Sequence, residues 1–388
     1  MTAPELLRRS DAHIPPSLRA ERYTRMRADV LGFYRGSAGV FYHRVGREPL
    51  LHQGPVGWLC GDLHAANFGT YKADNGLVYF DLNDFDEACL GPVLFDVLRL
   101  LVSVLLLAEH GGQAPAAQRH CAQDLLSQYT TALATGKAGY LERDTARGPI
   151  KQLLRQVAAR STRAQLKERT RNHSTRLRPG PNAPSLPKAE RSALLAQLEA
   201  WCRAQPARPF GRVLDASHRV AGVGSLGTPR YLVLAEHHQP GKRPVLLDLK
   251  AARPSALAPF ISLPQPAWAS EAHRVVEVQR RLQAVAPALL TAVPRLDQSF
   301  VLRVLQPSAD KFTFAPHPTR RLLETLPVLA RLTAWAQLRS TGRQGSATTD
   351  ELMGFAHAPA WEGAVLDLAQ TAQRQVWVDY RAFCAADL

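Results

Sequence analysis

Apolar residues recur every three or four positions over long stretches of the chain, a spacing that predicts amphipathic helices. The predicted helices cover residues 21–44, 97–109, 115–134, 150–171, 188–203, 270–286, 322–338 and 366–383. Within the first of them, one segment is expected to end at Gly36 and another to begin at Gly39. The first 20 residues are polar and contain prolines, so we expect them to form a loose arm. More than a third of the chain is therefore predicted to be helical.

The pattern changes at Phe210, where apolar and polar residues begin to alternate and glycines interrupt them. Alternation is typical of half-buried strands. The predicted strands lie at residues 77–80, 230–234, 244–249 and 299–305. We therefore predict an α+β fold with a helical lobe and an antiparallel sheet lobe at about residues 210–305.

Composition narrows the class of protein. The 388 residues are 46% hydrophobic, enough for one large two-lobed unit or two domains. The five cysteines are odd in number and form no CxxC pair, which favours reduced thiols in the cytoplasm. The N-terminus has no apolar segment typical of a signal peptide. The longest apolar run, residues 97–108, is interrupted by Arg99 and too short to span a bilayer, so no membrane partner is expected.

The net charge of +15 points to a polyanionic partner or to an anionic substrate. The basic residues are mostly arginines, concentrated between Arg143 and Arg191, and a GC-rich genome is an alternative explanation for them. Nucleic acid is not favoured, because the sequence has no basic strand interleaved with aromatics and no helix-turn-helix pattern.

The candidate chemistry lies in residues 58–100, where short polar turns separate apolar runs. Asn67 follows Asp62 in the spacing D-x-x-x-x-N, and Asp81 ends a predicted strand just before Asp84 and Asp86. Phosphoryl transfer needs a carboxylate that orients the attacking hydroxyl, and an Asn and an Asp that hold Mg²⁺. The alternative is that these are turn residues, since Asp and Asn hydrogen-bond their own backbone.

A second candidate site lies in the sheet region. Its glycine-rich loop connects two predicted strands and contains Gly222, Gly224, Ser225 and Gly227. A Rossmann loop would open a helix, whereas a strand–loop–strand arrangement is the one that covers ATP phosphates in kinases. Lys250 ends the next strand, where it is expected to reach the phosphates. A strand-end lysine that is merely exposed is the alternative.

The helix at residues 270–286 would then carry the carboxylate partner of Lys250. Glu277 is the first candidate and Glu271 the second. The alternative is that these glutamates only belong to the solvent-exposed face of the helix, as most charged helical residues do.

GDLHAANFG, from Gly61 to Gly69, resembles the catalytic loop of aminoglycoside and choline kinases. The following block, FDLNDFDEACLGPVLFDVLRL, resembles the bacterial family known as domain of unknown function DUF2252, and the likeness extends from about Tyr23 to Tyr380. The family name brings no established activity. The kinase resemblance implies a two-lobed fold in which Asp96 braces the catalytic loop. The alternative is that Asp96, at the start of a predicted helix, caps that helix.

The resemblance also implies roles for individual residues. Asp62 would act as the base, Asn67 and Asp81 would hold Mg²⁺ with Asp84 as a further ligand, and Lys250 would contact the phosphates of ATP. The parts come in a circularly permuted order, because the catalytic loop precedes the glycine loop. The expected units are a helical catalytic lobe at residues 1–205, a β-rich nucleotide lobe at 206–310 and C-terminal helices at 311–388 that pack on the helical lobe.

The favoured function is transfer of phosphate from ATP, with Mg²⁺, to an unknown hydroxyl of a small molecule or protein. One alternative is transfer of AMP. Another is a catalytically degenerate binding or regulatory protein, because Asp86 stands where kinases have the glycine of D-F-G and Ala251 follows Lys250. A metal-dependent hydrolase using Asp62, His64 and Asp81 is disfavoured, since it would need neither the glycine loop nor Lys250.

Overall fold

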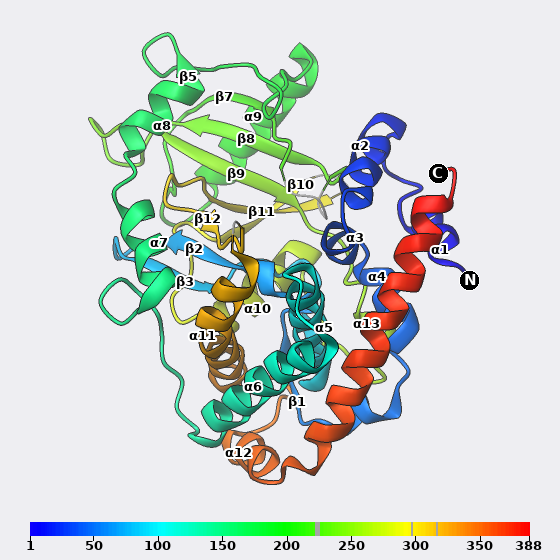
Figure 1. Ribbon diagram of the computed structural model, residues 1–388. Helices are drawn as coiled ribbons and strands as arrows, with labels where there is room; N and C mark the ends of the chain where they lie inside the picture. The colour runs from blue at the N-terminus through cyan, green and yellow to red at the C-terminus, as the bar shows by residue number, and fades with distance from the viewer. Residues whose placement is uncertain (222–225, 296–297, 316) are drawn as a thin grey trace.

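A computed structural model of the chain describes residues 1–221, 226–295, 298–315 and 317–388. Its architecture is mixed α+β with antiparallel sheets, as expected (Figure 1). The largest sheet lies in the upper part of Figure 1, and long helices form the lower part.

The largest sheet has the strand order β10-β11-β9-β8-β7, and every neighbouring pair is antiparallel. Its strands are β7 (Val213–His218), β8 (Arg230–Ala235), β9 (Val245–Ala251), β10 (Thr291–Arg295) and β11 (Gln298–Val304). Side chains alternate between the two faces of a strand. On β9, therefore, Leu247 and Leu249 lie on the face that packs in the core, and Asp248 and Lys250 lie on the other.

Helix α9 (Lys188–Arg203) covers the apolar face of this sheet. Leu194, Leu198 and Cys202 of α9 belong to one hydrophobic cluster with Leu247 and Leu249. The expected lobe boundary at residue 205 therefore does not separate the two cores, because α9 packs on the sheet.

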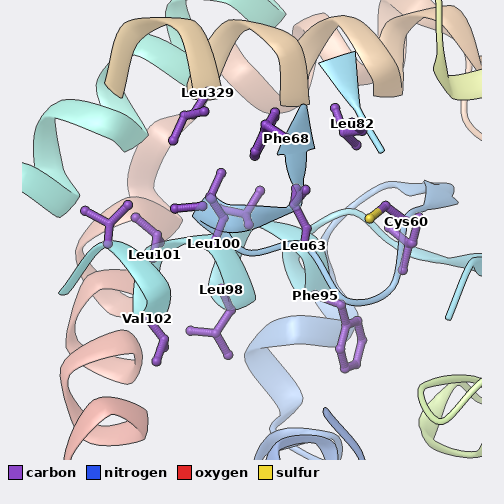
Figure 2. Packing of buried hydrophobic residues seen from close by; sticks show 14 of the residues in the cluster. Cys60, Leu63, Phe68, Leu82, Phe95, Leu98, Leu100, Leu101, Val102 and Leu329 are labelled. Carbon is purple, nitrogen blue, oxygen red and sulfur yellow. The ribbon is translucent and has the colours of Figure 1, made fainter. Parts of the chain in front are cut away.

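The helical core is built around α5 (Leu94–His110), which is buried from Leu94 to Ala108. A helix that is apolar on all sides is stable only inside a protein. The helices around it are α6 (Pro115–Ala134), α11 (Pro318–Arg339), α12 (Thr349–His357) and α13 (Glu362–Ala385). Figure 2 shows Leu100 and Leu101 of α5 on the side of Phe68 and Leu329, with Leu98 pointing away from them, and all of these residues belong to one hydrophobic cluster. The C-terminal helices thus complete the core that α5 begins.

Short strands sit between the sheet and the helices. They are β1 (Val56–Leu59), β2 (Phe68–Lys72), β3 (Val78–Leu82), β4 (Cys89–Pro92) and β12 (Asp310–Lys311). β1 pairs with β4, and β2 pairs with β3 and β12. The expected strand at residues 77–80 corresponds to β3. The segment that follows β3 lies close to the large sheet, because Asp84 and Asp86 are near Lys250 of β9.

Three helix predictions need correction. The expected loose arm contains α1 (Ala3–Ser10), whose Thr2 and Glu5 form a capping box. Residues 21–44 lie in α2 (Pro16–Arg27), α3 (Val30–Gly36) and α4 (Ala38–Val45). The division after Gly36 was expected, whereas the one before Val30 was not, because it depends on Asp29, which caps a new helix. Residues 150–171 divide into α7 (Gly148–Ala158) and α8 (Thr162–Arg169), where Ser161 caps the second.

The other expected elements match closely. Among them, the helix expected at residues 270–286 is α10 (Glu271–Leu282). The structure also contains elements that were not predicted: the short strands β5 (Thr170–Arg171) and β6 (Arg176–Leu177), and the 3₁₀ turns at Pro49–Gln53, Ala65–Asn67, Ala258–Phe260 and Pro359–Trp361. Among the described residues, no helix has both the length and the apolar content that crossing a lipid bilayer requires.

Candidate functional site

The loop between β1 and β2 carries Asp62. Its Oδ1 accepts a hydrogen bond from Arg99 Nε at 2.8 Å, and His64 Nε2 lies 3.8 Å from its Oδ2. Arg99 is fully buried, whereas the Asp62 side chain is 22% exposed. Burial raises the pKa of Asp62 to about 6, although the Arg99 charge opposes this, and the charge of Asp84 raises it further. Asp62 is therefore oriented by a buried cation and titrates just below neutrality.

Asp96 braces this loop from α5. Its carboxylate accepts hydrogen bonds from the backbone N–H groups of Cys60 at 2.8 Å and Gly61 at 2.9 Å. Two turns along, Ser103 Oγ accepts from Ala65 N at 2.9 Å. The bracing interpretation of Asp96 is confirmed and the capping interpretation is wrong, because the residue before α5 is Val93, with no side-chain cap. Figure 2 shows Cys60 and Leu63 of the loop near α5.

Asn67 joins the loop to the segment after β3. Its Nδ2 donates to the backbone oxygens of Asp62 at 3.0 Å and Asp84 at 3.3 Å. The side chain is buried. Asn67 thus holds the two aspartates in a fixed relation, and only its amide oxygen has the lone pairs that a cation requires.

Asp81 has a different environment. It is buried, its Oδ2 lies 3.1 Å from Arg339 Nη2, and the same oxygen accepts from Ala284 N at 3.3 Å. Burial raises its pKa while Arg339 opposes that change. Asp81 is not among the residues that line the large cavity described below. Its expected magnesium role stays a prediction, and the structure favours the alternative that Asp84 takes this role.

Asp84, Asp86 and Lys250 form one ion cluster. The Lys250 ammonium contacts Asp86 Oδ2 and lies 3.6 Å from Asp84 Oδ1. Burial opposes both charges, but Lys250 and Lys311 hold the pKa of Asp84 below its usual range, and Asp84 and Asp86 raise that of Lys250. The strand-end lysine thus meets the aspartates that follow β3, so it is not merely exposed.

The expected partner of Lys250 is wrong. Glu277 forms a surface pair with Arg280 at 3.0 Å, and Glu271 pairs with Arg274 at 2.7 Å. The reason lies in Arg274, which also donates to the backbone oxygens of Asp86, Ala88 and Arg253. Helix α10 therefore presents a cation, not a carboxylate, to the segment that Lys250 contacts.

These groups border one cavity of about 2200 Å³. Asp62, Asp84, Asp86 and Lys250 line it, together with Leu226 and Gly227 at the end of the glycine loop. Gly227 has φ +85°, and a Cβ there would lie 2.3 Å from Ile14 of the N-terminal segment. Gly222, Gly224 and Ser225 lie outside the described residues. The part of the glycine loop that is described therefore lies at the same cavity as the aspartates.

The donor set suits a hard cation. Asp62 and Asp84 bring carboxylate oxygens to the cavity, and Mg²⁺ is held by one or two carboxylates together with phosphate oxygens and water. In the part of the chain that the structure describes, no group of three or more His, Cys, Asp or Glu residues is arranged for a metal. The residues therefore fit Mg²⁺ that arrives with a phosphate ligand better than a cation held by protein alone.

Sequence reasoning missed several residues of this site. Arg99 follows Asp96 by three positions on α5, and that spacing places both on one face of a helix. Arg339, the partner of Asp81, gives no such signal, because it is distant in the sequence. Asp248 and Lys250 share a face of β9 through the two-residue period of a strand, but the arginines around Asp248 come from other strands.

Comparison with known proteins gives one match. The profile of a family described as an uncharacterized protein conserved in bacteria, DUF2252, matches residues 15–386. No curated protein and no solved structure matches the chain. Since the match covers nearly the whole length, the chain belongs to the bacterial family DUF2252.

Proposed function

We propose that this protein is an ATP- and Mg²⁺-dependent phosphotransferase that acts on a hydroxyl of a small molecule or protein. One observation carries the proposal. Asp62 and Asp84, from one block of the sequence, line the same cavity as Lys250, which lies far along the chain from them. A base, a metal-binding carboxylate and a phosphate-binding cation are the groups that phosphoryl transfer needs together.

Asp62 would take the proton of the acceptor hydroxyl. A base works best when its pKa lies near the working pH, and the pKa of Asp62, raised to about 6, meets that condition. Arg99 would hold the Asp62 carboxylate in one orientation through its hydrogen bond.

Asp84 would hold Mg²⁺, which would neutralise charge on the phosphates. Asn67, which like Asp81 does not line the cavity, would hold Asp62 and Asp84 in place through its Nδ2 and is not a direct ligand in this proposal. Lys250 would move from Asp86 to a phosphate, because its ammonium is the point charge that phosphates attract. Asp81 would remain a structural partner of Arg339, so Asp84 is the metal ligand in this proposal.

The order of the elements in the sheet region supports the proposal, and we propose with it a kinase-like fold in permuted order. The segment 206–310 runs strand, glycine loop, strand, strand with Lys250, helix and two strands. The nucleotide lobe of kinases follows the same succession, with the lysine on the third strand. The loop with Asp62 and the segment with Asp84 precede this lobe in the chain instead of following it. We propose that residues 1–205 and 311–388 together contribute the catalytic lobe.

One observation favours a second candidate, a protein that binds nucleotide without turnover. Asp86 occupies the position of the D-F-G glycine, and Lys250 contacts it in place of a glutamate from α10. An ion pair of this kind in the nucleotide site would have to break before catalysis.

A titration with ATP in the presence and absence of Mg²⁺ tests the proposal, with ADP and AMP measured in the same samples. We expect Mg²⁺-dependent binding and slow release of ADP when acceptors are supplied. Release of AMP would identify the nucleotidyl alternative. Binding without either product would favour the degenerate protein, and no binding at all would refute both.

A further inference from the structure

Three arginines surround one carboxylate on the cavity face of the large sheet. Asp248 Oδ1 accepts from Arg219 Nη1 at 2.8 Å and from Arg230 Nε at 2.7 Å, and its Oδ2 accepts from Arg230 Nη2 at 2.5 Å. Arg303 Nε lies 3.5 Å from the same Oδ2. All four residues line the cavity that contains Asp62 and Lys250.

This arginine cluster, Arg219, Arg230 and Arg303, places three positive charges around the single negative charge of Asp248, and the charges of Asp86 and Asp84 also act on Arg230. The Asp248 side chain is only 3% exposed, so water contributes little. Burial and the neighbouring arginines lower the pKa of Arg219 to about 10, although Asp248 opposes this. Buried like charges repel one another at low local dielectric. An anion in the cavity would relieve that repulsion.

The rest of this sheet face is apolar and packed against other parts of the chain. Leu232, Leu234 and Leu246 lie further along the same face, and they are already packed with Leu166, Leu177 and Ala183. Arg230, Asp248, Lys250 and Arg303 are the charged residues that β8, β9 and β11 contribute to the cavity. Guanidinium groups match the oxygens of phosphate in geometry and charge.

We propose that the arginine cluster is a phosphate-binding subsite beside Lys250, which is the cross-strand neighbour of Arg230. Its ligand is a phosphate group, either the terminal phosphates of the nucleotide or the phosphate of a phosphorylated second substrate. The assignment to either source rests on the proposed function, whereas the anion site itself does not.

The test uses the full-length protein and inorganic pyrophosphate as the probe, without metal, in isothermal titration calorimetry. Arg303→Gln is the main variant, because Arg303 is the most exposed of the three, at 29%, and has the longest contact with Asp248. Arg219→Gln is the second. Arg320→Gln is the matched control, since Arg320 is 78% exposed on α11 and pairs only with Glu324 among the described contacts.

We expect pyrophosphate to bind the wild type and the control alike, and each cluster variant about tenfold or more weakly, the loss of one charged hydrogen bond. Thermal unfolding of each variant shows whether it is folded. If pyrophosphate does not bind the wild type, or binds all four proteins equally, the subsite does not exist.

The two sources give different results in the same instrument. If the nucleotide supplies the phosphate, Arg303→Gln weakens Mg²⁺–ATP but not AMP, and pyrophosphate competes with ATP. If a second substrate supplies it, pyrophosphate and Mg²⁺–ATP bind together. Both results support the subsite. Pyrophosphate binding without any ATP binding would refute the proposed function and leave the anion site standing.

Discussion

Arg99 shows how partners far away in the sequence determine the state of a reactive residue. Its guanidinium lies 3.8 Å from the ring centroid of Tyr34 and 4.6 Å from that of Phe41, and its Nη2 donates to Tyr34 O at 2.7 Å. Aromatic faces stabilise a buried cation. The charge that orients Asp62 is therefore held by helices α3 and α4, which contain no part of the motif.

Lys250 is the first residue to test. We expect Lys250→Ala to abolish transfer, because the phosphates lose the ammonium group that would bind them. The same substitution removes the cation that lies between Asp84 and Asp86. The unfolding free energy should fall by about 1–3 kcal/mol, since two half-buried carboxylates lose a partner. Phosphate transfer and urea unfolding measure the two effects.

Glu277→Gln is the matched control for Lys250→Ala. Its surface pair with Arg280 is worth little in stability, so activity should stay close to that of the wild type. Transfer at the wild-type rate by folded Lys250→Ala would mean that the sheet lobe is not a nucleotide site.

Glu87 gives a pH dependence of stability. Burial raises its pKa to about 7 from an ordinary value of 4.5, while its hydrogen bond from Ala256 N opposes this. The folded state thus holds the proton more strongly than the unfolded state does. The stability that this contributes is present below pH 4.5 and is lost as pH rises through 7.

Glu87→Gln keeps the acceptor for Ala256 but cannot titrate. We expect the variant to gain on the order of 1 kcal/mol of stability relative to the wild type between pH 5 and pH 8. Urea unfolding of both proteins at the two pH values measures this gain. A constant difference in unfolding free energy would contradict the raised pKa.

At the scale of elements, α5 both fills the core and positions the loop with Asp62. Asp96→Ala removes two charge-assisted hydrogen bonds and leaves two buried N–H groups without acceptors. We expect a loss of about 2–4 kcal/mol in unfolding free energy and weaker Mg²⁺–ATP binding. Chemical denaturation and calorimetry are the measurements.

Asp124→Ala on α6 is the control for Asp96→Ala, because Asp124 is exposed and its one described ion pair is with His120. Its effect should stay within about 0.5 kcal/mol. Equal stability of the two variants would remove the bracing role of Asp96.

On the scale of the whole molecule, the two ends of the chain lie side by side (Figure 1). Arg8 Nη2 donates to Asp387 O at 2.5 Å, and Arg44 pairs with Asp379 of α13 at 2.8 Å. Neighbouring ends permit a chain to be joined and reopened elsewhere when the new cut is exposed.

We therefore expect a permutant to fold in which a short linker joins residue 388 to residue 1 and the chain begins at Pro206. Residues 206–208 are exposed between α9 and β7. This permutant has the order of parts found in kinases, and it should retain the circular dichroism spectrum and nucleotide affinity of the wild type. A permutant that aggregates or loses affinity would show that the native order is required.

The local sequence alone predicted the elements whose cause is local. The helices at residues 115–134 and 188–203 match α6 and α9, because their periodicity is uninterrupted. Strands β8, β9 and β11 of the large sheet follow from alternation, whereas β7 and β10 were not predicted as separate strands. The family follows from the block that begins at Phe80. The breaks near residues 28–29 and 159–161 were missed, since Asp29 and Ser161 cap helices within an otherwise helical pattern.

Tertiary structure alone decided which of several similar aspartates faces the cavity. Asp81 and Asp84 are three residues apart in one motif, yet Arg339 takes the first and Lys250 lies near the second. The pairing of Arg219, Arg230 and Arg303 with Asp248 likewise depends on the register of neighbouring strands. A linear pattern specifies which residues are charged, but the partners of a charge depend on segments that only folding brings together.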